Sequence, residues 1–142
     1  MPKTIFVNLP VRDLAASTAF YEALGFEKNP MFSDDNASSV MWSDAIVFML
    51  LKHEFYSTFT QLPIADARKA SGAIFALSRD SREDVDAMVE AAGKAGGRPD
   101  VRPAQDHGWM YVRTFEDPDG NVFEPAFMDP SAMAGQPDGA QA

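Results

Sequence analysis

The sequence has 142 residues, 46% of them hydrophobic and 23% charged, and this length and composition suit one compact globular domain with a real core. No apolar run approaches the roughly 20 residues that a membrane-spanning helix needs, and the chain begins directly with a strand-like segment. We therefore expect a cytoplasmic protein without a membrane segment or a signal segment.

The sequence contains no cysteine, which excludes disulfides, thiolate metal sites and cysteine nucleophiles. Twenty-one acidic and twelve basic residues give a net charge of −9. This charge repels nucleic acid and anionic lipid, so we expect neither as a partner, and it would favour a cationic ligand. Keeping the protein soluble is the alternative explanation of the charge.

A strand, a helix and three short strands are predicted in the first half of the chain. The first strand covers residues 3–9, and Pro10 closes it. Asp13 can cap a helix that ends just before Gly25. The three strands that follow are predicted over residues 26–32, 38–42 and 45–51. These elements form a βαβββ module over residues 3–51.

Residues 52–71 are predicted to bridge this module to the next one. A connection of about twenty residues is long for a loop, which favours a short helix or a functional segment within it.

The second half repeats the same order of elements over residues 72–128. A strand over residues 72–77 precedes a helix that opens at Ser81, carries an apolar stripe and ends at Gly96. Three further strands are predicted, over residues 98–101, 109–115 and 121–128, with a turn at 117–120 before the last one. Residues 129–142 have the composition of a low-complexity tail without visible chemistry.

The two halves read as copies of one module. Ile5 and Ile74 are 69 positions apart and Gly25 and Gly96 are 71 apart, a difference that the strand–helix connection can absorb. The last strands of the two copies match as well, and there the second copy has Glu124 where the first has Met49.

Two motifs give the chain a family resemblance. The first is Val-Arg-Asp-Leu at residues 11–14, followed by Phe-Tyr at 20–21 and Leu-Gly-Phe at 24–26; the second is Glu-Asp-Pro-Asp-Gly-Asn at 116–121, followed by Phe-Glu at 123–124. With them the chain resembles the glyoxalase, bleomycin-resistance and extradiol dioxygenase superfamily, also called the vicinal oxygen chelate proteins. The resemblance implies an α+β fold in which two βαβββ modules form a cupped mixed β-sheet. It also implies a single glyoxalase-like domain over residues 1–128 and a homodimer.

The resemblance also identifies the expected metal-binding positions. Glu124 matches the carboxylate that faces the cup and binds a divalent metal in this family. The other positions match Phe6, Met49 and either Ile74 or Phe75, which are apolar. Since a zinc, nickel or iron site needs three or four nitrogen and oxygen ligands, a divalent metal is doubtful and no other cofactor is expected.

Three polar residues are candidates for rebuilding a site. Asn8 lies two residues after Phe6, so strand alternation places it on the same face, inside the predicted cup, as a hydrogen-bonding group. His53 in the bridge and His107 before a strand could each reach the cup, although a loop histidine is more often solvated than a ligand.

The strand over residues 109–116 suggests a polar ligand pocket. Alternation places Tyr111 and Arg113 on one face, and facing inward they would lie beside Glu124. A phenol, a cation and a carboxylate with apolar walls suit an oxygen-rich or carboxylate-bearing small molecule. The alternative is structural: Arg113 pairs with Glu124 or Glu116, and Tyr111 packs on the sheet.

The resemblance leaves two main functions open. One is a lyase or isomerase of the lactoylglutathione lyase type, in which Glu124 is catalytic and the substrate is small and oxygen-rich or of the glutathione type. The other is a metal-free small-molecule binding protein of the bleomycin-resistance type. A third, an enzyme that uses Glu124, Tyr111 and His107 without metal, lacks a recognisable catalytic arrangement.

Overall fold

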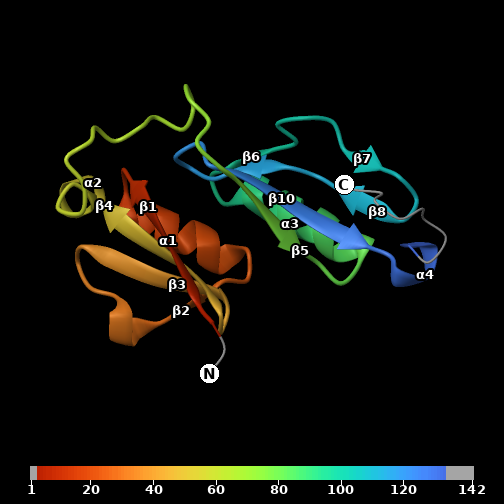
Figure 1. The fold of residues 1–142 in the computed structure, drawn as a ribbon, viewed down its shortest axis with the longest axis horizontal. Coiled ribbons are helices and arrows are strands. Elements are labelled where there is room, and N and C mark those ends of the chain that lie inside the picture. The colour runs from red at the N-terminus through yellow and green to blue at the C-terminus, as the bar shows by residue number, and fades with distance from the viewer. Residues whose placement is uncertain (1–2, 134–142) are drawn as a thin grey trace. The chain divides into compact units, whose positions relative to one another are not determined.

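The computed structural model describes residues 3–133 (Figure 1). The chain divides between Ala70 and Ser71 into two compact units, here called unit 1 and unit 2. Each mixes helices with a curled sheet of parallel and antiparallel strands, which confirms the α+β fold class. No helix among the described residues is both long and apolar enough to cross a membrane.

Unit 1 is a four-stranded sheet with one helix along it. In chain order its elements are β1 (Ile5–Val11), α1 (Leu14–Ala23), β2 (Glu27–Lys28), the 3-10 turn η1 (Pro30–Phe32), β3 (Ala37–Ser43), β4 (Ile46–Lys52) and α2 (His53–Tyr56). The strand order is β1-β4-β3-β2, with β1 parallel to β4 and the other pairs antiparallel.

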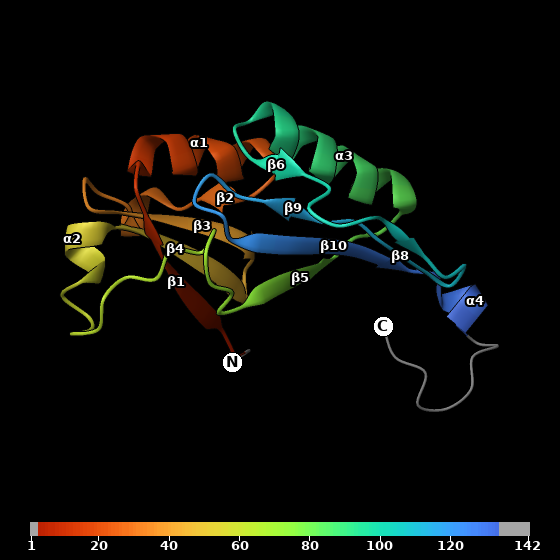
Figure 2. The ribbon, with the colours of Figure 1, turned by 90° about the horizontal axis from the view of Figure 1, so that it is seen from above.

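Helix α1 covers one face of this sheet (Figure 2). The Asp13 carboxylate caps it by accepting a hydrogen bond from the Ala16 backbone N–H at 3.0 Å. Its own Phe20 and Tyr21 are fully buried, and the Tyr21 ring contacts those of Phe26 and Phe48. The apolar side of α1 thereby fixes which face of the sheet is buried beneath a helix.

Unit 2 is built around its last long strand. Its elements are β5 (Ile74–Ser78), α3 (Arg82–Lys94), β6 (Arg98–Pro99), β7 (Gln105–Asp106), β8 (Met110–Val112), β9 (Phe115–Glu116), β10 (Val122–Met128) and α4 (Pro130–Met133). Strand β10 is parallel to β5 on one side and antiparallel to β8 and β9 on the other.

Helix α3 covers one face of the β5-β10-β8 sheet (Figure 2). The Ser81 hydroxyl caps it by accepting from the Asp84 backbone N–H at 3.0 Å. The buried stripe is the predicted one, namely Val85, Met88, Val89 and Ala92. Across from it the Phe115 and Phe123 rings stack at 5.2 Å and are fully buried.

The turn before β10 holds that strand in register. Asp117 is buried, and its Oδ1 accepts hydrogen bonds from the backbone N–H groups of Asp119 at 2.9 Å and Asn121 at 2.8 Å. Gly120 has φ 96°, a conformation that glycine adopts without strain. The family-like motif at residues 116–121 therefore has a structural role, which is to start the strand that carries Glu124.

Several predicted elements need correction. Residues 26–32 form only the short β2, because Asn29 caps a 3-10 turn that contains Pro30, which has no N–H to donate to a ladder. The strand predicted over 109–115 is two strands, interrupted where the Thr114 carbonyl accepts from the Asp100 N–H at 2.7 Å. Strand β7 was not predicted. A short helix in the bridge is confirmed as α2.

The predicted tail also contains structure, because α4 occupies residues 130–133. The rest of that tail, residues 134–142, lies outside the described residues. The division into one domain, a bridge and a tail stays a prediction.

Strand register gives the alignment of the two copies. Met49 of unit 1 matches Glu124 of unit 2, and their partners on the parallel strand are Asn8 and Ala76. Asn8 therefore corresponds to Ala76, and Phe6 corresponds to Ile74, 68 positions later. The helix caps, Asp13 and Ser81, are also 68 apart. The prediction that matched Ile5 to Ile74 was therefore off by one residue. The extra length lies inside the helix, which has 13 residues in unit 2 and 10 in unit 1, and not in the strand–helix connection.

Candidate functional site

Glu124 lies on the face of the unit 2 sheet opposite α3. Along β10, Phe123 and Pro125 are buried toward α3, so alternation directs Glu124 to the other side. Its partner on β5 is Ala76, an exposed residue, and Ile74 two positions earlier shares that face. Phe75 points the other way and packs its ring against Phe123 at 5.2 Å. Of the two residues that could match the metal-binding position on this strand, Ile74 and not Phe75 shares the face of Glu124.

Glu124 forms an ion pair with Arg102. Arg102 Nη2 lies 2.8 Å from Glu124 Oε2, and the exposed fractions of the two side chains are 44% and 20%. The Arg102 backbone N–H donates to the Thr114 hydroxyl oxygen at 3.2 Å, which anchors the loop that carries it. Arg102 was missed by sequence reasoning, because it belongs to an irregular segment with no periodicity to assign it to a face.

A second acid–base pair lies on the same face. Glu116 pairs with Val122 across β9 and β10, and therefore faces the same side as Glu124. Its carboxylate binds Arg98 Nη2 at 2.6 Å. Arg98 is 70% exposed and belongs to β6, the strand at the edge of this sheet.

Tyr111 and Arg113 lie on the other face, against α3. Tyr111 pairs with Phe127 across β8 and β10, and its hydroxyl donates to Asp86 Oδ1 at 2.7 Å. Arg113 Nη1 donates to the same Asp86 oxygen at 2.9 Å. This placement corrects the prediction of a phenol, a cation and a carboxylate in one pocket, since the pleat directs these side chains away from Glu124.

The structural alternative for Arg113 also needs correction. Arg113 pairs neither with Glu124 nor with Glu116, which bind Arg102 and Arg98 instead. It donates through Nε and Nη2 to both oxygens of Asp100, at 3.0 and 2.7 Å. Asp100 has φ 52°, and it is the one non-glycine residue with positive φ in the part of the chain that the structure describes.

The α3 face carries a network of titratable groups. The hydrogen bond from Tyr111 lowers the pKa of Asp86 and, for the same reason, raises the pKa of Tyr111. A two-nitrogen hydrogen bond from Arg82 holds the pKa of Asp106 well below its usual range. These bonds join α3 to the β7–β8 hairpin, which makes the network structural.

The two histidines lie in different units. His107 is exposed in the turn between β7 and β8, where its backbone N–H donates to the Met110 carbonyl at 2.8 Å. His53 begins α2 in unit 1 and lines a hollow of about 320 Å³ together with Arg12, Leu14, Lys52 and Glu54.

In unit 1, Asn8 lies on the face opposite α1. Phe6 shares that face and is 60% exposed, and Met49 is the residue that pairs with Asn8. Asn8 is exposed as well. The unit 1 counterpart of the Glu124 position therefore offers one amide and apolar side chains.

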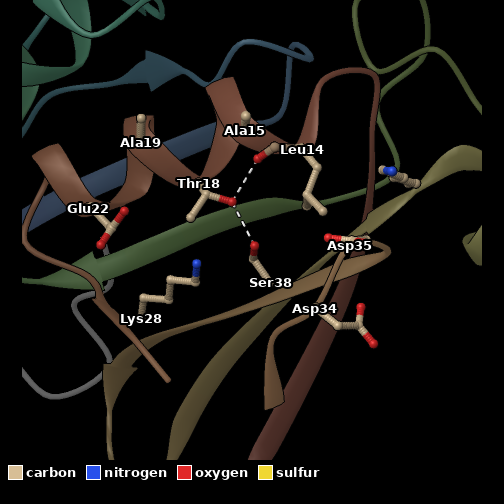
Figure 3. Close-up of a pocket in the computed structure, with 10 residues that line it drawn as sticks. Leu14, Ala15, Thr18, Ala19, Glu22, Lys28, Asp34, Asp35 and Ser38 are labelled. Atoms are coloured by element: carbon tan, nitrogen blue, oxygen red, sulfur yellow. Dashed lines mark hydrogen bonds between the residues drawn. The ribbon is translucent and has the colours of Figure 1, made fainter. Parts of the chain in front are cut away.

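A larger hollow of about 570 Å³ opens on the α1 side of unit 1 (Figure 3). At its floor the hydroxyls of Thr18 and Ser38 lie 2.7 Å apart in a hydrogen bond. Its wall mixes three carboxylates, of Glu22, Asp34 and Asp35, with the ammonium groups of Lys28 and Lys52. None of the predicted site residues lines it.

The donor set does not fit a divalent metal. Of the four positions that the resemblance identifies, Phe6, Met49 and Ile74 offer no nitrogen or oxygen donor, and Glu124 is already bound to Arg102. Among residues 3–133, no group of three or more histidine and carboxylate side chains is placed to hold a metal ion.

The chain shares its fold with several solved structures. A hypothetical protein from S. aureus is 25% identical, with a TM-score of 0.74 over 91% of this chain and 94% of that one. A glyoxalase/bleomycin resistance protein/dioxygenase family enzyme from Burkholderia phytofirmans is 21% identical, with a TM-score of 0.72 over 89% and 99%. The fosfomycin resistance protein FosX from Mesorhizobium loti is 18% identical, with a TM-score of 0.67 over 95% and 99%.

No curated protein matches the chain significantly. The family model "Glyoxalase/Bleomycin resistance protein/Dioxygenase superfamily" matches residues 5–124, which span both βαβββ copies and end at Glu124. The chain therefore belongs to the glyoxalase/bleomycin resistance protein/dioxygenase superfamily.

Proposed function

We propose that this protein binds a small organic molecule without a metal ion, on the face of unit 2 that carries Glu124. The observation that carries the proposal is the 2.8 Å ion pair between Glu124 and Arg102. In a metal-dependent relative this carboxylate would bind the metal; here a guanidinium takes that place. A carboxylate and a guanidinium side by side can orient an organic ligand by hydrogen bonds.

The surroundings of the pair support this function. Ile74 is 56% exposed although it is a large apolar residue, and Ala76 directly opposite Glu124 is small and exposed. An apolar surface with a few convergent polar groups is the usual composition of a small-molecule site.

The test is a thermal-shift screen of small molecules in the presence of a chelator. We expect hits that bind saturably, and we expect Ala76→Phe to abolish binding because the ring fills the space beside Glu124. Ala65→Phe, in an exposed part of the bridge, is the matched control and should leave binding intact. Binding that requires added metal, or that survives Ala76→Phe, would refute the proposal.

A lyase or isomerase of the lactoylglutathione lyase type is the second candidate. The observation in its favour is that Glu124, a half-buried carboxylate, stands at the position of the metal-binding carboxylate of the family. Nickel- or zinc-loaded protein would then turn over a hemithioacetal substrate, and Glu124→Ala would abolish this turnover. No turnover with either metal would eliminate the candidate.

We further propose that the protein is a cytoplasmic homodimer. Strand β1 is at the edge of its sheet, and Ile5 and Phe6 on it are both more than half exposed, which suits burial against a second copy. Light scattering should give twice the chain mass, and Phe6→Glu should lower it to that of the single chain.

A further inference from the structure

We infer that Arg102 is the group that selects the ligand, and that the ligand class is small organic acids with one carboxylate and an apolar remainder. This inference rests on the proposed function, because it identifies what the face around Glu124 binds. It goes beyond that proposal by assigning the polar contact to a residue of an irregular loop.

Arg102 has unused hydrogen-bond donors. A guanidinium has five N–H groups in a fixed fork, and Arg102 uses Nη2 for Glu124. Its side chain has no other hydrogen bond or ion pair with residues 3–133. The remaining donors can therefore take both oxygens of a ligand carboxylate, which is the geometry that arginine prefers.

The same unit contains an arginine that already binds more than one carboxylate at once. Arg113 donates through Nε and Nη2 to Asp100 and through Nη1 to Asp86. Arg102 contacts Glu124 through one nitrogen only, which leaves the other side of its guanidinium for a second carboxylate. A ligand carboxylate can thus bind Arg102 while Glu124 keeps its own bond, so no carboxylate is left without a cation.

The backbone that carries Arg102 is fixed. The N–H groups of Asp100 and Arg102 both donate to Thr114, one to its carbonyl at 2.7 Å and the other to its hydroxyl at 3.2 Å. Thr114 is 1% exposed, and Asp100 is further held by Arg113. The side chain of Arg102 is 44% exposed, so the guanidinium is accessible on a rigid support.

The rest of the ligand is apolar because the surface beside the pair is apolar. Ile74, Ala76 and Val122 share the face of Glu124 by strand register. The net charge of −9 does not exclude an acid, since salt screens charges beyond about 8 Å at physiological ionic strength and the contact with Arg102 is direct.

Arg98 provides the matched control. It also binds a glutamate on the same face through one nitrogen, but it lies on the edge strand β6 and is 70% exposed. A guanidinium so open to water contributes little to an ion pair or to binding.

The experiment compares carboxylates with their neutral amides by calorimetry or ligand-observed NMR. The probes are benzoate against benzamide and hexanoate against hexanamide, with wild type, Arg102→Gln and Arg98→Gln. We expect each acid to bind wild type at least about tenfold more tightly than its amide. Arg102→Gln should remove this preference, and Arg98→Gln should change it less than about twofold.

Equal binding of acids and amides, or a preference that survives Arg102→Gln, overturns the inference but leaves the proposed function standing. No binding of any small molecule to wild type, in these tests and in the thermal-shift screen, overturns both. Circular dichroism of Arg102→Gln checks that the variant folds. Arg102→Lys keeps the positive charge but lacks the planar guanidinium, and it should recover part of the preference for acids over amides. This partial recovery would distinguish a ligand contact from a purely structural role.

Discussion

At the scale of single residues, burial decides what each arginine contributes. Arg113 is 13% exposed and bonds to Asp86 and Asp100, whereas Arg98 is 70% exposed and bonds to one glutamate. A guanidinium that is 13% exposed and makes three charged hydrogen bonds therefore contributes more than one that is 70% exposed and makes one.

Arg113→Gln should therefore lower the free energy of unfolding by about 2–3 kcal/mol, because two carboxylates lose charged hydrogen bonds. Arg98→Gln should change it by less than about 0.5 kcal/mol. Urea unfolding followed by circular dichroism measures both. Equal effects of the two variants would show that the α3 network does not stabilise the fold.

The same network predicts loss of stability in acid. The pKa values of Asp86 and Asp106 are lowered in the folded protein, so the folded state binds fewer protons than the unfolded chain near and below the ordinary aspartate pKa of about 4. Their stabilisation is complete at neutral pH and decreases as the pH falls below about 5. Melting temperatures measured from pH 7 to pH 3 should fall accordingly.

Tyr111→Phe is the control for this pH dependence. It removes the hydrogen bond that contributes most to the lowered pKa of Asp86. The variant should melt at a lower temperature at pH 7, and the difference from wild type should shrink toward pH 3. A constant difference across this range would mean that the Asp86 hydrogen bond does not depend on its charge.

At the scale of helices and strands, the sequence predicts best where one residue type has one structural role. Asp13 and Ser81 start helices because their side-chain oxygens accept the first free N–H groups. Gly25 and Gly96 end them in the left-handed region, with φ of 100° and 107°. These four positions place both helices without any knowledge of tertiary contacts.

Gly25→Ala tests this role. The added methyl group meets no atom within 4 Å, so the whole cost is conformational and should be about 1–2 kcal/mol at φ 100°. Gly72 has equally open space and no positive φ, and Gly72→Ala should leave stability unchanged or raise it by up to about 1 kcal/mol. Denaturant midpoints compare the two, and a neutral Gly25→Ala would contradict the prediction.

The faces of β8 were harder to predict. Met110 and Val112 are buried and Tyr111 is half-buried, so neither face of the strand is clearly polar. The alternation of side chains therefore does not show which face packs against α3. The position of Glu124 follows from the motif and the turn, and was predictable. Arg102 was not, because its placement depends on the bond from its backbone to Thr114, which no local pattern encodes.

At the scale of the whole molecule, the two copies of the module together offer one carboxylate at the four positions where the resemblance expects metal ligands. By register, Phe6 corresponds to Ile74 and Met49 corresponds to Glu124. Three of these four side chains are apolar, and the fourth is bound to Arg102. The chain thus belongs to the family without the donor set that the resemblance implies, which is why fold membership alone does not define the activity.

Metal removal should therefore leave the molecule unchanged. After treatment with a chelator we expect the melting temperature to stay within about 1 °C, and titration with nickel, zinc, manganese or iron(II) to give no saturable rise, because a metal that bound the folded state would stabilise it. Elemental analysis of the untagged protein should find far less than one metal per chain. Stoichiometric metal with a saturable rise would contradict this and would implicate the histidines outside the β10 face. His53→Ala and His107→Ala would then identify the metal ligand, because replacing the histidine that binds the metal would abolish the rise in melting temperature. Glu124→Gln would show whether the carboxylate leaves Arg102 to bind the metal.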